Sequence, residues 1–155
     1  LPMWAPGRLG VVQDDLSILF SPETYREVFL PAIRRMASHF EQTLFHFHNG
    51  CMHQLDTLIA VPEISVIQFG IDPQTPPVIT CEAALRRIQQ AGKGLFIGVL
   101  APDEVHPLIN RLDPRNLLLL TTTPDDETSR RLLEKAAGWT RERISALGLT
   151  TQGGS

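Results

Sequence analysis

Two histidines of this 155-residue chain, His46 and His48, have the residue type and spacing best suited to chemistry. They lie two positions apart in the segment LFHFHN, residues 44–49, with Phe45 and Phe47 alternating with them. Successive side chains of a β-strand point to opposite faces, so both imidazoles share one face and both phenyl rings the other. Paired imidazoles at a strand end can bind a metal ion, hold an anionic substrate or relay protons. We therefore predict that His46 and His48 are catalytic, with a hydrogen-bonded core pair as the structural alternative.

Other polar residues follow the remaining predicted strands, and in parallel α/β folds the reactive groups gather at the carboxyl ends of the strands. The residues expected to bind substrate are Asn49, Gln68, Asp72 and Thr122. Asp14 and Asp15, which precede a Ser-Pro-Glu helix start, could join them. Thr123 is expected to cap the helix that follows it. Cys51 and Cys81 form no CxxC pair and are expected to be structural, although Cys51 could reach a metal.

The elements that must position these residues alternate between two types along the chain. Short apolar segments typical of buried strands occur at residues 44–48, 64–69, 95–100 and 117–122. Helical patterns occur at residues 22–40, 52–60, 81–91, 103–112 and 125–147. The first pattern predicts one apolar stripe, formed by Tyr25, Val28, Phe29, Ala32, Ile33, Met36 and Phe40.

This alternation predicts an α/β fold of parallel (β/α) units. Either an open doubly wound sheet or part of a (β/α)8 barrel fits the order of elements. No GxGxxG or Walker loop follows a predicted strand, which weakens the nucleotide-binding form of the doubly wound sheet.

Length and composition favour one domain over residues 1–155, with residues 1–15 as an extended arm and residues 150–155 as a frayed tail. Apolar residues make up 43% of the chain and charged residues 20%, a globular composition. The formal net charge of −3, without a basic run, argues against a nucleic-acid partner. No apolar segment approaches the length of a membrane span and no signal peptide is readable, so we expect a cytoplasmic protein without a membrane partner.

Several segments together resemble the uroporphyrinogen decarboxylase superfamily, in an uncharacterised branch. The resemblance covers about residues 11–139 and rests on Ser-Pro-Glu at 21–23, Phe-Leu-Pro at 29–31, the histidine-bearing strand at 44–49, and residues 62–68 and 88–95. It implies the C-terminal half of a TIM-type (β/α)8 barrel. It also implies a cofactor-free lyase for an acidic tetrapyrrole-like or carboxylate substrate, completed by a partner or an N-terminal half. His46 and His48 would then orient or protonate that substrate.

Two further functions stay open. Methyltransferases of the same superfamily bind zinc through His-x-Cys and a later Cys, and this chain has His46-x-His48 at the first position and threonines at residues 121–123. The resemblance therefore also allows a zinc-dependent corrinoid/thiol methyltransferase with His46 and His48 as ligands. The other alternative is a non-catalytic fragment or assembly domain.

A half-barrel leaves two strand edges and one face of the sheet uncovered. The inward residues expected on that face include Leu44, Ile64, Val66 and Leu119. Burial of apolar surface contributes about 25 cal/mol per Å², so an open face would remove much of a small net stability. Besides a small-molecule substrate, we therefore expect a homodimer or a missing N-terminal half as the partner.

Overall fold

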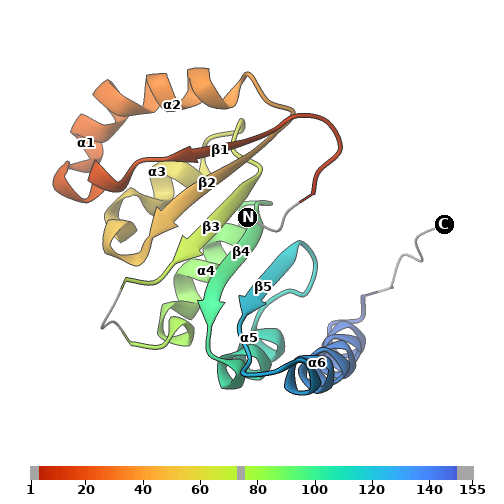
Figure 1. Cartoon of the computed structure of the whole chain (residues 1–155). Coiled ribbons are helices and arrows are strands. Elements are labelled where there is room, and N and C mark those ends of the chain that lie inside the picture. The colour runs from red at the N-terminus through yellow and green to blue at the C-terminus, as the bar shows by residue number, and fades with distance from the viewer. Residues whose placement is uncertain (1–3, 73–75, 150–155) are drawn as a thin grey trace.

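One five-stranded parallel sheet organises the computed structural model, which describes residues 4–72 and 76–149. Its strands lie side by side in chain order, as Figure 1 shows. Their bounds are β1 Leu9–Gln13, β2 Gln42–His48, β3 Val66–Gly70, β4 Gly94–Leu100 and β5 Leu117–Thr121. A doubly wound sheet reverses its strand order at a switch point. This sheet does not, so the structure is an α/β fold with the sequential order of a (β/α) half-barrel.

Helical segments connect the strands. The α-helices are α1 Pro22–Thr24, α2 Leu30–Ala37, α3 Leu55–Ile59, α4 Glu82–Gln90, α5 Val105–Arg111 and α6 Asp126–Ala146. Four 3-10 segments, η1 Asp15–Leu19, η3 Asn49–Gln54, η4 Val78–Cys81 and η5 Pro102–Glu104, and the π-helical η2 Tyr25–Phe29 complete the connections. At α6 the cap is Asp125, whose Oδ1 accepts from the Thr128 N–H at 2.7 Å, so the prediction that Thr123 is the cap is wrong. Asp125 lies two residues after Thr123, and its carboxylate also interacts favourably with the positive end of the helix dipole.

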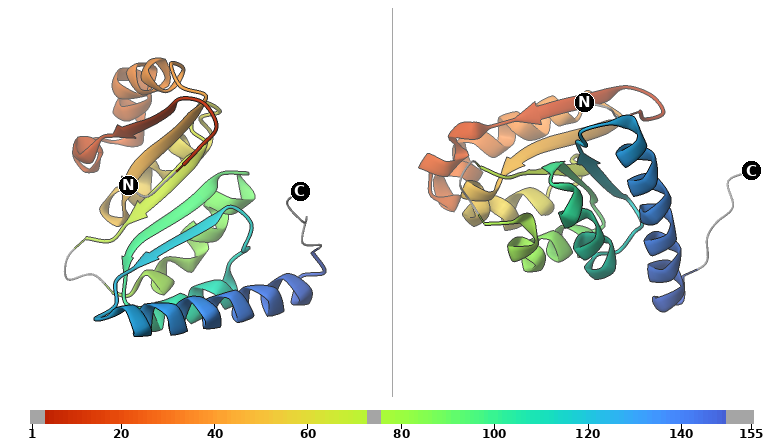
Figure 2. Two further views of the ribbon diagram at one scale, coloured as in Figure 1. Left: turned by 45° about the vertical axis from the view of Figure 1, so that its right-hand side comes forward. Right: turned by 60° about the horizontal axis from the view of Figure 1, so that its bottom comes forward.

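The core lies between the sheet and the helices on one of its faces. Figures 1 and 2 show α3, α4 and α5 on the same side of the strands. Sequential parallel strands joined by right-handed crossovers place every connecting helix on one side. Phe45 and Phe47 pack there, as the alternation predicts. The buried cluster on this side also contains Ile67, Phe69, Leu95 and Ile97 from the strands and Leu55, Leu58, Leu85, Ile88 and Leu108 from the helices.

The opposite face of the sheet, the open face, has no helix over it among the residues that the structure describes (Figure 2). Register places Val11, Leu44, Val66, Phe96 and Leu118 there, together with His46 and Gln68. Leu44 and Phe96 are buried by their neighbours, whereas Val11 is 53% and Leu118 38% exposed. The prediction that Ile64 and Leu119 face inward is wrong, since Ile64 belongs to the helix-side core and Leu119 packs against it.

The strand β1 lies inside the segment that the sequence suggested was only an arm. Leu9 pairs with Gln42 and Gln13 with His46, so residues 9–13 form an edge of the sheet. At Gly10 the Phe40 ring lies directly against β1, because a Cβ there would lie 2.2 Å from Cδ2 of Phe40. Residues 1–3, at the start of the expected arm, and residues 150–155, the expected tail, lie outside the described residues.

The helical pattern at residues 22–40 is interrupted, which changes its buried side. The π-helical turn η2 Tyr25–Phe29 adds a residue to one turn and shifts the phase of the residues that follow. Tyr25, Ile33 and Ala37 are buried, but Val28 is 61% and Met36 48% exposed. The single apolar stripe predicted from a 3.6-residue period is therefore wrong for Val28 and Met36.

A strained residue near the end of β4 gives a stability prediction. Val99 has φ 59°, in the left-handed region, within an irregular stretch between Ile97 and Leu100, and its side chain is 88% exposed. That conformation costs a β-branched residue about 1–2 kcal/mol, whereas Asn tolerates it. Val99→Asn is expected to raise the free energy of unfolding in urea by about 1 kcal/mol. An unchanged or lower urea midpoint for Val99→Asn would contradict the assignment.

Candidate functional site

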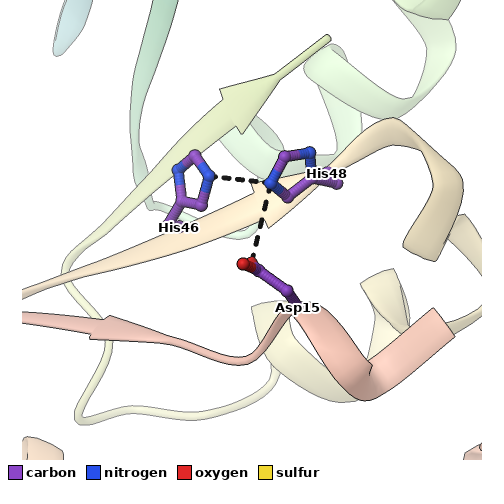
Figure 3. A group of neighbouring side chains, drawn as sticks. All are labelled: Asp15, His46 and His48. Carbon is purple, nitrogen blue, oxygen red and sulfur yellow. Dashed lines mark hydrogen bonds and ion pairs between the residues drawn. The ribbon is translucent and has the colours of Figure 1, made fainter. Parts of the chain in front are cut away.

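The two histidines lie at the carboxyl end of β2 on the open face, with the side chains directed toward each other (Figure 3). Their rings meet edge to face, with centroids 4.6 Å apart and an interplanar angle of 89°. Across the sheet, Gln68 pairs with His46 and Gly70 with His48. A Cβ at Gly70 would lie in ordinary van der Waals contact, 3.4 Å from Cε1 of His46 and 3.7 Å from Nδ1 of His48, so both rings lie directly against β3.

A continuous chain of hydrogen bonds holds the two imidazoles. Gln68 Oε1 lies 3.0 Å from His46 Nδ1, and the two Nε2 atoms of His46 and His48 lie 2.9 Å apart. His48 Nδ1 lies 2.7 Å from Asp72 Oδ1. Residues from the ends of β2 and β3 therefore fix both rings, and the edge of each ring that carries Nε2 faces the other.

Asp15 completes the cluster from a third segment. It is the first residue of η1, directly after β1, and its Oδ1 lies 3.6 Å from His48 Nε2 (Figure 3). Gln13 Nε2 donates to the other carboxylate oxygen at 2.6 Å. The register pairs Gln13 with His46. The turn that follows β1, with Asp15, therefore lies beside the two histidines. The sequence suggested Asp15 only as a possible addition, because β1 had not been recognised.

The hydrogen-bond partners determine where the protons of the imidazoles lie. A carboxylate and an amide oxygen only accept, so His48 Nδ1 donates to Asp72 and His46 Nδ1 donates to Gln68. In two neutral rings both Nε2 atoms then carry lone pairs, and these face each other at 2.9 Å. A shared proton or a metal ion between the two Nε2 atoms would bridge these lone pairs, whereas a Gln68 amide that presents its NH₂ group to His46 would let His46 Nε2–H donate to His48.

The donor set fits a divalent metal ion. Asp15, His46 and His48 each offer one ligand atom, and these atoms lie within 4.8 Å of one another. Two nitrogens on a tetrahedral zinc are about 3.3 Å apart, given Zn–N distances of about 2.0–2.1 Å. The two Nε2 atoms, 2.9 Å apart, would therefore have to separate only slightly to bind one zinc ion. Two imidazoles and one carboxylate are the ligands of several catalytic zinc sites, in which a fourth position is left open.

The other residues predicted at the site have different placements. Gln68 and Asp72 contact the histidines directly. Asn49 contacts them only indirectly, because its Oδ1 accepts from the backbone N–H of Asp72 at 3.1 Å. Thr122 follows β5, two strands away from β3, and does not join this group. Cys51 is buried and its Sγ accepts from Ser17 Oγ at 3.2 Å, so it lies in the core instead of among the metal ligands.

The edge of the sheet that bears the site is acidic. The described segments that follow the strands contain no Lys or Arg, and four of them contain acids, within residues 14–21, 49–54, 71–72, 76–81, 101–104 and 122–127. Their acids are Asp14, Asp15, Asp72, Asp103, Glu104, Asp125, Asp126 and Glu127. Burial, followed by the neighbouring charge of Asp15, raises the pKa of Asp14 despite a backbone hydrogen bond. Such an edge attracts cations and repels substrates with several negative charges.

A cavity of about 560 Å³ lies near the amino ends of β3, β4 and β5, where Val66, Gly94 and Asn116 line it, whereas the histidines lie at the carboxyl end of β2. The His48 side chain is 31% and the Asp15 side chain 56% exposed. The cluster is therefore open to solvent on the side that faces away from the helices.

Comparison of the chain with protein-family models, with curated proteins and with solved structures finds no match. Within residues 4–72 and 76–149, no helix has both the length and the apolar character required to cross a membrane.

Proposed function

We propose that this chain is the metal-binding part of a (β/α) barrel enzyme of the uroporphyrinogen decarboxylase superfamily, in which zinc activates a thiol for methyl transfer. The observation that carries the proposal is the cluster of Asp15, His46 and His48, in which the two Nε2 atoms lie 2.9 Å apart and Asp15 Oδ1 lies 3.6 Å from His48 Nε2. A barrel architecture is supported by the sequential order of the five parallel strands and by the helices on one face.

The residues of the chain have separable roles in this proposal. Asp15, His46 and His48 would supply three ligand atoms to the ion, and a fourth position would be open to a substrate thiol. When bound, zinc acts as a Lewis acid that stabilises a thiolate at neutral pH. Gln68 holds His46 with Nε2 directed toward the ligand position. The acidic edge admits a neutral or cationic thiol more readily than a polycarboxylate.

The lyase suggested by the resemblance is the second candidate, and the same histidine contact supports it. A proton shared between His46 and His48 across 2.9 Å could protonate a carbanion left by loss of a carboxyl group. A polycarboxylate substrate also needs cationic partners. The strand-end segments of the described chain contain no Lys or Arg, so another segment would have to supply them. The zinc-dependent proposal needs no such addition and is the stronger of the two.

Cobalt substitution tests the proposed chemistry on the chain itself. Co²⁺ takes tetrahedral N and O ligand sets similar to those of Zn²⁺ and absorbs visible light, and a bound thiolate adds an intense near-ultraviolet band. The Co²⁺-loaded protein is expected to gain that band on addition of 2-mercaptoethanol, and less readily on addition of the anionic thiol mercaptosuccinate. Visible bands that respond to neither thiol would contradict thiol activation at this site. A protein that binds no cobalt would contradict the zinc-dependent proposal and leave the cofactor-free lyase and the assembly role.

A further inference from the structure

Asp72 links the loops that follow β2 and β3. Its Oδ1 accepts from His48 Nδ1 at 2.7 Å, and its Oδ2 accepts from the Gly50 N–H at 3.3 Å. Its own backbone N–H donates to Asn49 Oδ1 at 3.1 Å. A Cβ on Gly50 would lie 3.2 Å from Asp72 Oδ2 and 2.9 Å from Ile18 Cδ1, so the Asp72 carboxylate lies close against the backbone of this loop. Both carboxylate oxygens of Asp72 therefore have defined partners, and its position relative to His48 is fixed from both loops.

The two histidines differ in what holds their Nδ1 atoms. His46 donates to a neutral amide oxygen of Gln68, whereas His48 donates to a carboxylate. A carboxylate accepts only, so it excludes the tautomer with the proton on Nε2, and its charge makes the opposite nitrogen a stronger electron-pair donor. An amide in its place can offer either an oxygen or an NH₂ group, and the NH₂ group favours the other tautomer.

We propose that Asp72 is a positioning residue of the metal site, which fixes the tautomer and the ring orientation of His48 so that Nε2 presents its lone pair to the ion. The expected effect of Asp72 on metal affinity rests on the proposed function. Its expected effect on the His48 tautomer applies to the metal-free protein as well. Removal of such an outer carboxylate typically lowers metal affinity by about 10–100-fold.

The test compares Asp72→Asn with Asp103→Asn. Asp103 is an exposed acid at the same edge of the sheet, after β4, so its replacement removes the same charge without touching the histidines. Zinc affinity is measured by competition with a chromophoric chelator. Asp72→Asn is expected to bind zinc about 10–100-fold more weakly than the wild type, and Asp103→Asn less than about threefold more weakly. Equal losses in the two variants would show a general charge effect and overturn the inference, as would no loss in Asp72→Asn.

Nitrogen-15 NMR of the histidines in the metal-free protein supplies a readout that general loss of stability does not mimic. Wild-type His48 is expected to carry its proton on Nδ1, and Asp72→Asn is expected to shift the population toward the Nε2–H form. Asp72→Glu, which keeps the carboxylate, replaces Asp72→Asn if that variant does not fold, and should keep the Nδ1–H form. An unchanged tautomer in Asp72→Asn, or an Nε2–H form in the wild type, would overturn the inference. A wild type with the Nδ1–H form but no zinc affinity would refute the proposed function alone.

Discussion

Alanine in place of His46 or His48 is expected to lower the affinity of the chain for zinc by at least about 100-fold, more than loss of an outer partner does. Each imidazole supplies one of only three ligand atoms in the cluster. Stability should change by less than about 1 kcal/mol, because both side chains lie on the half-exposed open face and water can replace their hydrogen bonds. Chelator competition and thermal unfolding measure the two quantities on the same samples.

The matched control for these variants is His53→Ala. His53 is exposed, follows the same strand within η3 and contacts the backbone oxygen of Phe20 instead of the cluster. Its replacement is expected to leave zinc affinity unchanged. If His46 and His48 are instead satisfied core residues, their replacement should cost about 1–3 kcal/mol each with no change in metal affinity. That combination would contradict the functional assignment.

The purified chain is expected to self-associate through its open face and strand edges. Among the described strands, β1 and β5 each have only one neighbour, so each presents a row of unpaired N–H and C=O groups. Val11 and Leu118 on the open face add apolar surface near those edges. Light scattering across a dilution series should give a mass of two chains or more at the higher concentrations and a fall in mass on dilution.

Lysine at an edge position tests which surface is responsible, because a charged edge opposes strand pairing. Val11→Lys and Leu118→Lys are expected to shift the association to at least about tenfold higher concentration, a cost of about 1.4 kcal/mol. Leu133→Lys, at a 70% exposed position of α6, is the control and should associate as the wild type does. A wild-type mass of one chain at every concentration would contradict the prediction and show that the five-stranded sheet is stable alone.

The histidine pair was predictable because it depends on the two-residue period of a strand alone. His46 and His48 share a face and Phe45 and Phe47 share the other, as the alternation requires. The rule that polar groups gather at the carboxyl ends of parallel strands also brought Gln68 and Asp72 to the site. Both deductions use only local sequence and the expectation of parallel strands.

Asp15 and Thr122 show where this reasoning failed. Recognising Asp15 required β1, a five-residue strand whose glycine and glutamine weaken the apolar pattern and which forms through pairing with β2, a contact distant in sequence. Thr122 follows a predicted strand, but that strand is separated from β3 by β4, and strand order cannot be obtained from local periodicity. The phase shift by η2 was likewise invisible, since a π-helical turn has no reliable sequence pattern.

X-ray absorption spectroscopy at the zinc edge, on the protein loaded with one equivalent of zinc, tests the central claim most directly. A site formed by Asp15, His46 and His48 predicts a first shell of nitrogen and oxygen only, at about 2.0–2.1 Å, with the outer-shell scattering of two imidazoles. Asp15→Ala should keep the outer-shell scattering of both imidazoles, with water in the place of the carboxylate oxygen. Sulfur scattering at about 2.3 Å, which would indicate Cys51 or Cys81, or a spectrum of hydrated zinc without imidazole, would contradict the site.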